Sequence, residues 1–442
     1  MKRTTQMDFT LWFAQTSTPA FAERRTAMLW RNTVAPEAIQ PAWQKLLLQP
    51  VPPRKRLIYL HVPFCDTSCT FCGFYQNKYQ SDETEKYVSY LLRKIEMEAD
   101  SRLDQSAHVH TVYFGGGRPT SLSAKSLHRI ISLPREKLPL VPDCEITIEG
   151  RILNFDDERI DACLDAGANR FSIGIQTFDS HIRKCMARTS NRQQSVTFLE
   201  KLCRRDRTTT VCDLMFGLPG QTAENWQQYL KTVREIGLDG VDLYALNLLP
   251  GTPLAKAVEN QRAALPDISE RRDLYLQGVL RLAEYGWRRL SNSHSASTTR
   301  VCNLYNLLIK QRADCLALGA GVGGNLNGQA YTMHRLLDNG QKNIGMMPPA
   351  VAHSQRWLHS LQGGIDAGRL DLTTLVPMPE RLQKLVEQWY QSGLLKDASL
   401  CLRLTNDGRF WANNLMQSLA EIVMQLTATQ SEKGSHYATH PL

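Results

Sequence analysis

The stretch RLIYLHVPFCDTSCTFCG, residues 56–73, joins an apolar run typical of a buried strand to three closely spaced cysteines. Cys65, Cys69 and Cys72 follow the pattern C-x3-C-x2-C. Three thiolates this close together can surround one metal centre, and thiolates favour zinc or iron–sulfur clusters. A structural zinc site needs a fourth ligand, and no second C-x2-C or H-x3-H follows at zinc-ribbon spacing. The spacing therefore favours a [4Fe–4S] cluster held by three cysteines, with one iron open to another ligand.

The run at 56–62 is the first of several strand-like segments that alternate with helical ones. The strand-like segments are rich in β-branched and other apolar residues and lie at 56–62, 109–114, 144–148, 170–175, 209–216 and 241–246. The helical segments lie at 82–99, 121–133, 156–166, 179–204 and 222–236. This alternation predicts an α/β fold with a parallel sheet and right-handed crossovers. The period alone fits both an open or three-quarter barrel and a doubly wound sheet.

Residues that could bind a ligand or take part in catalysis lie where these strands end. They are Cys65, Cys69 and Cys72 after the first strand, Gly115, Gly116 and Gly117 after the second, Glu149 after the third, Gln176 after the fourth, Asp213 near the end of the fifth, and Asn247 after the sixth. Parallel α/β folds place their chemistry at the carboxyl-end rim of the strands. We therefore expect one site at this rim.

The segments that flank the alternating region have a different character. Residues 1–54 contain several prolines and little periodicity, and we interpret them as an N-terminal extension. Residues 55–290 would form the sheet domain and residues 291–442 a C-terminal domain. Within the latter, 378–425 shows two helical patterns around a short strand-like run at 401–405, which predicts a small, mainly helical, winged-helix-like fold.

The charge balance points to an anionic partner. The formal net charge is +9, yet no long Lys/Arg run concentrates it, which argues against nucleic acid. No stretch approaches 18 apolar residues, so no membrane span is expected. Most of the 11 cysteines occur singly, and polar residues interrupt any apolar leader at the N-terminus. These features predict a cytoplasmic protein with reduced thiols.

The cysteine stretch resembles the signature of radical S-adenosylmethionine (SAM) enzymes. The shared pattern is Tyr59-x-His61-x-Pro63-Phe64-Cys65-x3-Cys69-x-Phe71-Cys72. More narrowly, the chain from about residue 55 to 425 is similar to the oxygen-independent coproporphyrinogen III oxidase superfamily, and within it to the anaerobic haem-degrading branch of radical SAM methyltransferases. The resemblance implies a partial (β/α)6 barrel and a [4Fe–4S] cluster whose open iron binds SAM.

The resemblance also implies two SAM molecules, one as radical source and one as methyl donor. For the SAM on the cluster it carries over residues of the cysteine loop and the strand ends, namely Tyr59, Phe71, Gly73, Gly115, Gly116, Gly117, Arg118 and Glu149. Asn247 also aligns with a SAM contact of the family, with a different residue type. For the second SAM it carries over Gln176, Arg188 and Asp213. The chain departs from the family pattern at Arg118, where Thr is usual, and at Glu149-Gly150-Arg151-Ile152, where Glu-x-Asn-Pro is usual. The second departure favours the haem-degrading branch.

The function that the resemblance implies is the opening of haem to a linear methylated tetrapyrrole, with release of iron. It further implies a flavodoxin- or ferredoxin-type electron donor and a downstream tetrapyrrole reductase or carrier. The basic chain suits the propionates of haem, because arginine binds carboxylates with two hydrogen bonds. Two alternatives share the scaffold: coproporphyrinogen III oxidase, and a haem chaperone without turnover. His61, His294, His334 and His353 are candidate ligands of the haem iron.

Overall fold

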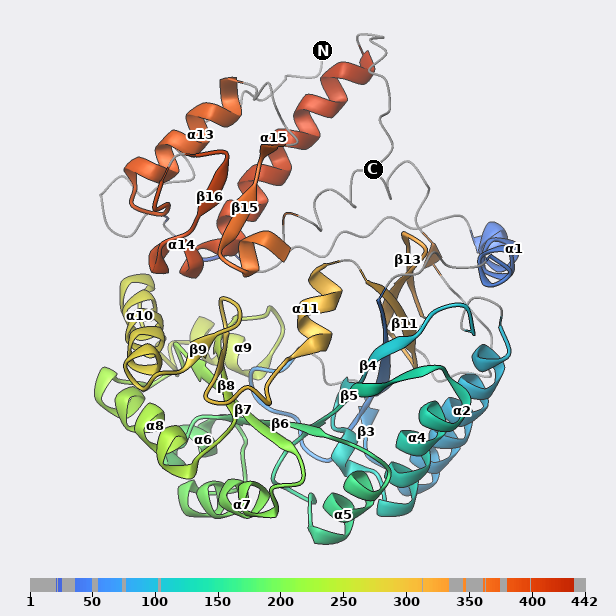
Figure 1. The fold of residues 1–442 in the computed structure, drawn as a ribbon. Coiled ribbons are helices and arrows are strands. Elements are labelled where there is room, and N and C mark those ends of the chain that lie inside the picture. Colours follow the sequence, from blue (N-terminus) through green and yellow to red (C-terminus); the bar gives the residue numbers. More distant parts are fainter. Residues whose placement is uncertain are drawn as a thin grey trace. The chain divides into compact units, whose positions relative to one another are not determined.

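The computed structural model divides the chain into two compact units, which are described separately (Figure 1). One unit is Arg31–Arg356, and the other combines Met1–Trp30 with Trp357–Leu442. The structure describes residues 21, 23–25, 36–49, 55–73, 77–101, 105–311, 313–333, 345–346, 361, 363–373, 380–397 and 399–432. This division differs from the domain boundaries at residues 54 and 290 that the sequence predicts, and those boundaries stay a prediction.

The larger unit is built on a twelve-stranded sheet whose centre is parallel. Its strand order is β14-β13-β12-β11-β1-β4-β5-β6-β7-β8-β10-β9. The six predicted strands are β1 (Arg56–Val62), β4 (Val109–Gly116), β5 (Leu140–Gly150), β6 (Arg170–Gln176), β7 (Thr209–Phe216) and β8 (Gly240–Ala245). They follow one another in the sheet in chain order and pair in parallel. A doubly wound sheet would reverse its order at a switch point, so the partial barrel is confirmed and the other arrangement excluded.

Helices cover the outer side of this curved sheet, as Figure 1 shows. They are α2 (Ser81–Ala99), α4 (Ala124–Lys137), α5 (Asp157–Asp165), α7 (Arg192–Arg205), α8 (Ala223–Ile236) and α10 (Ile268–Glu284). Local sequence explains their ends: Thr222 and Asn225 form a capping box at the start of α8, and Gly237 ends that helix at φ +79°.

The helix expected at 179–204 is wrong as one element. It is divided into α6 (Ser180–Cys185) and α7. Ala187 takes the left-handed conformation at φ +56°, which stops α6. Asn191 then starts α7 with its own capping box to Gln194.

The two faces of the parallel strands have opposite character. Apolar side chains such as Phe114, Ile148, Phe171, Ile173 and Leu214 are at most 1% exposed on the face that meets the helices. The other face carries Tyr59, Glu149, Asp213 and Tyr244, which all keep partial access to solvent. The interior of the barrel is therefore polar and reachable, which is the condition for a ligand to enter.

Shorter elements complete the larger unit. They are α1 (Pro36–Leu47), β2 (Phe64–Cys65), β3 (Asn77–Lys78), the 3-10 turn Pro119–Ser121, α9 (Pro253–Glu259), β9 (Arg288–Arg289), β10 (His294–Ala296), α11 (Leu304–Lys310), β11 (Asp314–Leu318), β12 (Gly323–Leu326), β13 (Gln329–Thr332) and β14 (Gly345–Met346). Strand β11 pairs in parallel with β1 and extends the sheet beyond the predicted six strands.

The smaller unit confirms a mainly helical C-terminal fold. It contains β15 (Arg369–Asp371), α13 (Glu380–Gln391), β16 (Cys401–Arg403), α14 (Asn406–Phe410) and α15 (Ala412–Glu432). Strands β15 and β16 pair antiparallel around α13. The N-terminal segment packs here, since Phe21 contacts Trp411 with ring centroids 5.1 Å apart. In the described residues, no helix is long and apolar enough to cross a membrane.

Two leucines of α10 test the outer packing of the barrel. Leu282 is 1% exposed and Leu280 is 51% exposed in the same helix. We expect Leu282→Ala to lower the free energy of unfolding by about 2–5 kcal/mol, because it leaves a cavity in the core. Leu280→Ala should change it by about 0.5 kcal/mol or less. Urea unfolding followed by circular dichroism compares the two, and equal losses would contradict the packing described.

Candidate functional site

The three cysteines lie on the loop that follows β1 and are held by backbone hydrogen bonds. Cys65 is 7% exposed and its carbonyl accepts from the Tyr79 N–H at 3.1 Å. The Cys72 N–H donates to the carbonyl of Cys69, which is 6% exposed, at 3.2 Å. Between them, the Thr70 hydroxyl donates to the Cys185 carbonyl at 3.3 Å, which ties the loop to the end of α6. The loop is thus anchored at both ends and presents two buried thiols, Cys65 and Cys69, and one partly exposed thiol, Cys72.

Arginines surround this loop. Arg118 forms an ion pair with Asp66, and Arg151 Nη1 donates to the Thr67 carbonyl at 3.4 Å. Burial raises the pKa of the Cys65 thiol, while the positive charges of Arg151 and Arg118 oppose the rise. Burial and the neighbouring Arg151 lower the pKa of Arg118 to about 10, so its guanidinium stays charged at neutral pH.

A further arginine lies on the other side of the cysteine loop. Burial and Arg151 lower the pKa of Arg188 to about 10, and Cys69 and Cys72 partly offset that shift. Arg188 Nη1 donates to the Gly174 carbonyl at 2.8 Å, and its guanidinium lies 5.8 Å from the ring centroid of Phe71. The predicted contacts Arg188 and Phe71 are therefore neighbours of each other and of the cysteines.

These residues fit an anionic iron–sulfur cluster. Arg118 Nε and Nη1 and Arg188 Nε are buried without a hydrogen-bond partner within the described ranges, whereas Arg118 Nη2 pairs with Asp66; this leaves donors for a negative group. In the same ranges, no three His, Cys, Asp or Glu side chains converge on one point suited to a single ion. A cube needs no such convergence, because each cysteine binds a different iron of the cluster.

The glycines that end β4 bring backbone close to Glu149. Gly116 has φ +113°, and a Cβ there would lie 2.5 Å from the His61 ring. A Cβ on Gly117 would lie 2.6 Å from the Phe64 carbonyl oxygen, so a side chain at Gly116 requires movement of His61, and one at Gly117 requires movement of the loop backbone at Phe64. The Gly116 N–H donates to Glu149 Oε2 at 3.3 Å. Glycine here is thus required by close approach.

Glu149 lies among tyrosines in the barrel interior. The Tyr113 hydroxyl donates to Glu149 Oε1 at 2.6 Å. Burial raises the pKa of Glu149, and the Tyr113 hydrogen bond opposes that rise. Tyr59 and Tyr113 stack with centroids 6.0 Å apart, and Tyr305 of α11 stacks on Tyr113 at 4.3 Å. Sequence reasoning missed Tyr113 and Tyr305; the alternation of β4 could have placed Tyr113 inside, but nothing local marks Tyr305.

The residues expected to serve a second SAM meet around the end of β6. Gln176 takes φ +65°, and its buried Oε1 has no partner within the described chain. Asp213 lies opposite Gly174 in the sheet register, and the Ser172 hydroxyl donates to Asp213 Oδ1 at 3.2 Å. Gly174 therefore has all three residues as neighbours: it accepts a hydrogen bond from Arg188, lies beside the Gln176 side chain and pairs with Asp213 across the sheet.

Two other predicted contacts lie on the rim. Asn247 is exposed in the loop after β8. Gly73 faces the same loop, since a Cβ there would lie 2.5 Å from Leu249 Cδ1.

The candidate histidines have different surroundings. His61 Nδ1 lies 3.3 Å from the Tyr59 hydroxyl, and burial lowers the pKa of His61 to about 4. His294 makes a short hydrogen bond to Asp242, another interior residue that sequence reasoning missed. His334 and His353 lie outside the described residues.

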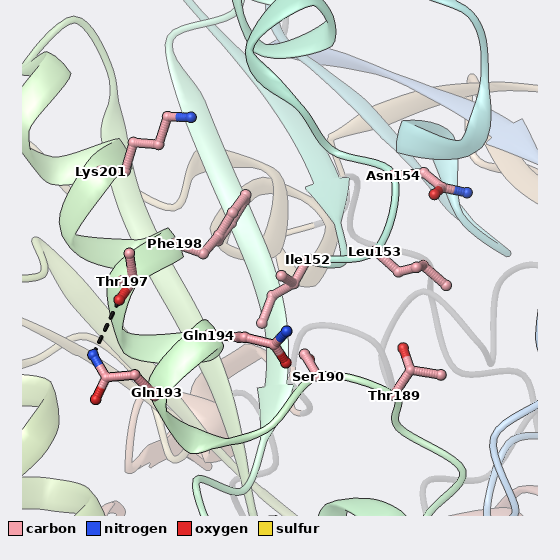
Figure 2. Close-up of a pocket in the computed structure, with 10 residues that line it drawn as sticks. All are labelled: Ile152, Leu153, Asn154, Thr189, Ser190, Gln193, Gln194, Thr197, Phe198 and Lys201. Atoms are coloured by element: carbon pink, nitrogen blue, oxygen red, sulfur yellow. Dashed lines mark hydrogen bonds between the residues drawn. The ribbon is translucent and has the colours of Figure 1, made fainter.

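A separate pocket of about 600 Å³ opens beside the site (Figure 2). It is lined by Ile152, Leu153, Asn154, Thr189, Ser190, Gln193, Gln194, Thr197, Phe198 and Lys201. Asn154 Nδ2 donates to Asp66 Oδ2 at 3.1 Å, which links this pocket to the cysteine loop. None of the site residues predicted from the sequence lines it.

Comparisons with known proteins agree with this geometry. Residues 59–233 match the family model of the radical SAM superfamily. The chain is 55% identical to anaerobilin synthase of Escherichia coli O157:H7 over 437 residues, which cover 97% of this chain and 98% of that one. It is 31% identical to an oxygen-independent coproporphyrinogen III oxidase of Salmonella typhimurium over 325 residues, 71% of this chain and 66% of that one. The solved coproporphyrinogen III oxidase of Escherichia coli has the same fold, with a TM-score of 0.72 at 22% identity over 87% of this chain and 94% of that one.

The carboxyl of Asp213 gives the interior a pH dependence. Burial, with the nearby Asp242 and Glu149, raises the pKa of Asp213 to about 8, against about 3.9 in an unfolded chain. The native state therefore holds one more proton than the unfolded state between about pH 4 and 8, and this group's contribution to stability falls as pH rises through that window. We expect Asp213→Asn to melt at a higher temperature than wild type at pH 8, with the difference shrinking toward pH 5.

Thermal unfolding of the cluster-free chain across that range measures the effect. Asp165→Asn, which removes an exposed carboxylate, is the matched control. A difference that stays constant with pH, or grows toward low pH, would contradict a protonated Asp213.

Proposed function

Because the chain belongs to the radical SAM superfamily and, within it, to the anaerobilin synthases, we propose that it degrades haem without oxygen. In this proposal it is a radical SAM C-methyltransferase that opens the porphyrin ring to a linear methylated tetrapyrrole and releases iron. The observation that carries the proposal is the 55% identity over 97% of the chain to anaerobilin synthase.

Cys65, Cys69 and Cys72 would hold the [4Fe–4S] cluster through their thiolates. When bound, the cluster supplies the electron that cleaves SAM to a 5′-deoxyadenosyl radical. The chain's own part is to bury the thiols and to surround them with Arg118, Arg151 and Arg188, whose charges favour an anionic group. A flavodoxin- or ferredoxin-type protein is the proposed electron donor.

The rim and the interior would hold two SAM molecules. Tyr59, Gly115–Gly117 and Glu149 form one contiguous surface, in which the Glu149 carboxylate can accept from an amino or ribose hydroxyl group. Phe71, Gly73, Arg118 and Asn247 would complete this first site. Gln176, Arg188 and Asp213 would hold the methyl donor, with the unpartnered Gln176 Oε1 as an acceptor.

Haem is the proposed substrate, with its propionates bound by arginines of this basic chain. Two departures from the oxidase-type pattern, Arg118 and Arg151, lie together beside Cys65. They add two positive charges where the family pattern has neutral side chains, which favours a haem-degrading site over coproporphyrinogen oxidation. A cytoplasmic location, and a reductase or carrier that takes up the tetrapyrrole, complete the proposal.

The substrate test offers haem and coproporphyrinogen III separately, under anaerobic reduction with SAM. We expect loss of the haem Soret band, release of iron, and a tetrapyrrole heavier by one methylene unit per methyl transferred. Mass spectrometry and an iron chelator follow the products. Cys69→Ala should abolish turnover, whereas Cys185→Ala, which changes an exposed thiol next to the same loop, should retain it.

The outcomes separate the three functions on this scaffold. Decarboxylation of coproporphyrinogen III with haem untouched would replace the proposal by the oxidase. Stable haem binding without consumption of SAM would indicate the chaperone.

A further inference from the structure

A buried carboxylate–imidazole pair crosses the interior between β8 and β10. His294 lies opposite Asp242 in the antiparallel register, and its Nδ1 makes a short hydrogen bond to Asp242 Oδ1. The two residues are 3% and 4% exposed. The Tyr244 hydroxyl donates to the second oxygen, Asp242 Oδ2, at 3.5 Å. Both carboxylate oxygens are therefore used, and the imidazole is fixed in one orientation.

The hydrogen bond also fixes the tautomer. With Asp242 Oδ1 as the acceptor of this hydrogen bond, His294 Nδ1 carries the proton, and in the neutral ring Nε2 keeps its lone pair. Within the described ranges no hydrogen bond reaches His294 Nε2, and this nitrogen is not among the unpartnered polar atoms sealed from solvent. His294 is 3% exposed, and its Nε2 is thus a Lewis-basic nitrogen with a small opening toward the interior.

Position in the sheet places this nitrogen in the interior. Asp213, Asp242 and His294 lie at matching register positions of β7, β8 and β10. Tyr244, two residues after Asp242 on the same strand face, is 38% exposed and packs edge-on against the His294 ring at 6.0 Å. The pair therefore borders the solvent-accessible side of the sheet, next to Asp213 of the proposed methyl-donor site.

A histidine whose second nitrogen donates to a carboxylate has the arrangement of a metal ligand, because the carboxylate orients the ring and raises its basicity. We infer that His294 Nε2 binds the iron of haem, with Asp242 as its positioning residue. This inference rests on the proposed haem substrate. His61, the other described interior candidate, lacks a carboxylate partner and bonds to Tyr59 instead.

The coordinate bond has a consequence for the reaction. It forms between the Nε2 lone pair and iron, and no electron or proton changes hands. Because the meso carbons surround the iron in one rigid macrocycle, the ligand would fix their distance from the methyl donor bound near Asp213. A contact of this kind accelerates a reaction mainly because it holds the reacting carbon in the correct position.

The test compares haem with iron-free protoporphyrin IX, which shares every contact except the metal. Both are titrated anaerobically into the full chain with its cluster reconstituted, for wild type, His294→Ala, Asp242→Asn and His128→Ala. Absorption difference spectra and electron paramagnetic resonance of ferric haem report the axial ligand. His128 is an exposed histidine on α4 and serves as the matched control.

We expect His294→Ala to bind haem at least tenfold more weakly, to lose the histidine-ligand spectrum, and to bind protoporphyrin IX as wild type does. Added imidazole should restore the spectrum. Asp242→Asn should keep the ligand and weaken haem binding by roughly 10- to 100-fold. Normal protoporphyrin IX binding shows that both variants are folded.

Two results would overturn the inference. One is a haem spectrum of His294→Ala that is the same as that of the wild type. If product formation alone falls in that variant, the pair would act as a proton donor and not as an iron ligand. The other is an equal loss of haem and protoporphyrin IX binding, which would make the pair structural. Haem bound through His294 in a wild type that consumes no SAM would refute the proposed function and leave the ligand standing. Conversely, the wild type could open haem while His294→Ala shows the same haem spectrum as the wild type. That result would support the proposed function and refute His294 as the iron ligand.

Discussion

The burial of several guanidinium groups around three cysteine thiols is the constraint on which the site depends. Burial and the neighbouring Arg151 lower the pKa of Arg118 and of Arg188, and some nitrogens of these two side chains have no hydrogen-bond partner in the described chain. Asp66 pairs with Arg118, but the remaining buried positive charge is costly, because water no longer solvates it. An anionic cluster bound to the thiols would offset this cost. The positive charge of the arginines and the negative charge of a bound cluster would therefore balance each other.

The rest of the barrel interior also contains buried ionisable groups, but these are acidic. The interior carries Glu149, Asp213 and Asp242, and burial raises the pKa of the first two. Burial lowers the pKa of Arg170, which is fully buried nearby, but the neighbouring Glu145, Tyr113, Asp242 and Asp213 outweigh this effect and raise it overall. The arginines around the cysteines suit an anion, and the carboxyl groups of the interior suit a ligand that offers hydrogen-bonding groups. The arginines follow β4, β5 and α6 and lie beside the cysteine loop, whereas the carboxyl groups lie on β5, β7 and β8.

Much of this could be predicted from sequence, for local reasons. The six strands are runs of apolar and β-branched residues, and parallel strands bring their carboxyl ends to one rim, which places Gly115–Gly117, Glu149 and Gln176 together. What could not be predicted depends on distant partners. Asp242 and His294 are 52 residues apart in the sequence, and they meet because β10 turns back antiparallel to β8. Tyr305 reaches Tyr113 from a short helix after the barrel, and the break in the 179–204 helix depends on one left-handed residue, Ala187.

The most direct test of the central claim is the reduction potential of the reconstituted cluster in wild type and in Arg118→Thr, measured by anaerobic redox titration with electron paramagnetic resonance. Reduction adds negative charge to the cluster, so a buried cation beside Cys65 should favour the reduced form. We predict a more negative potential in Arg118→Thr than in wild type, with the same iron and sulfide content. Arg207→Thr, a change at an exposed arginine on the outer surface, should leave the potential unchanged. An unchanged or less negative potential in Arg118→Thr would contradict the claim that these arginines compensate the charge of the cluster.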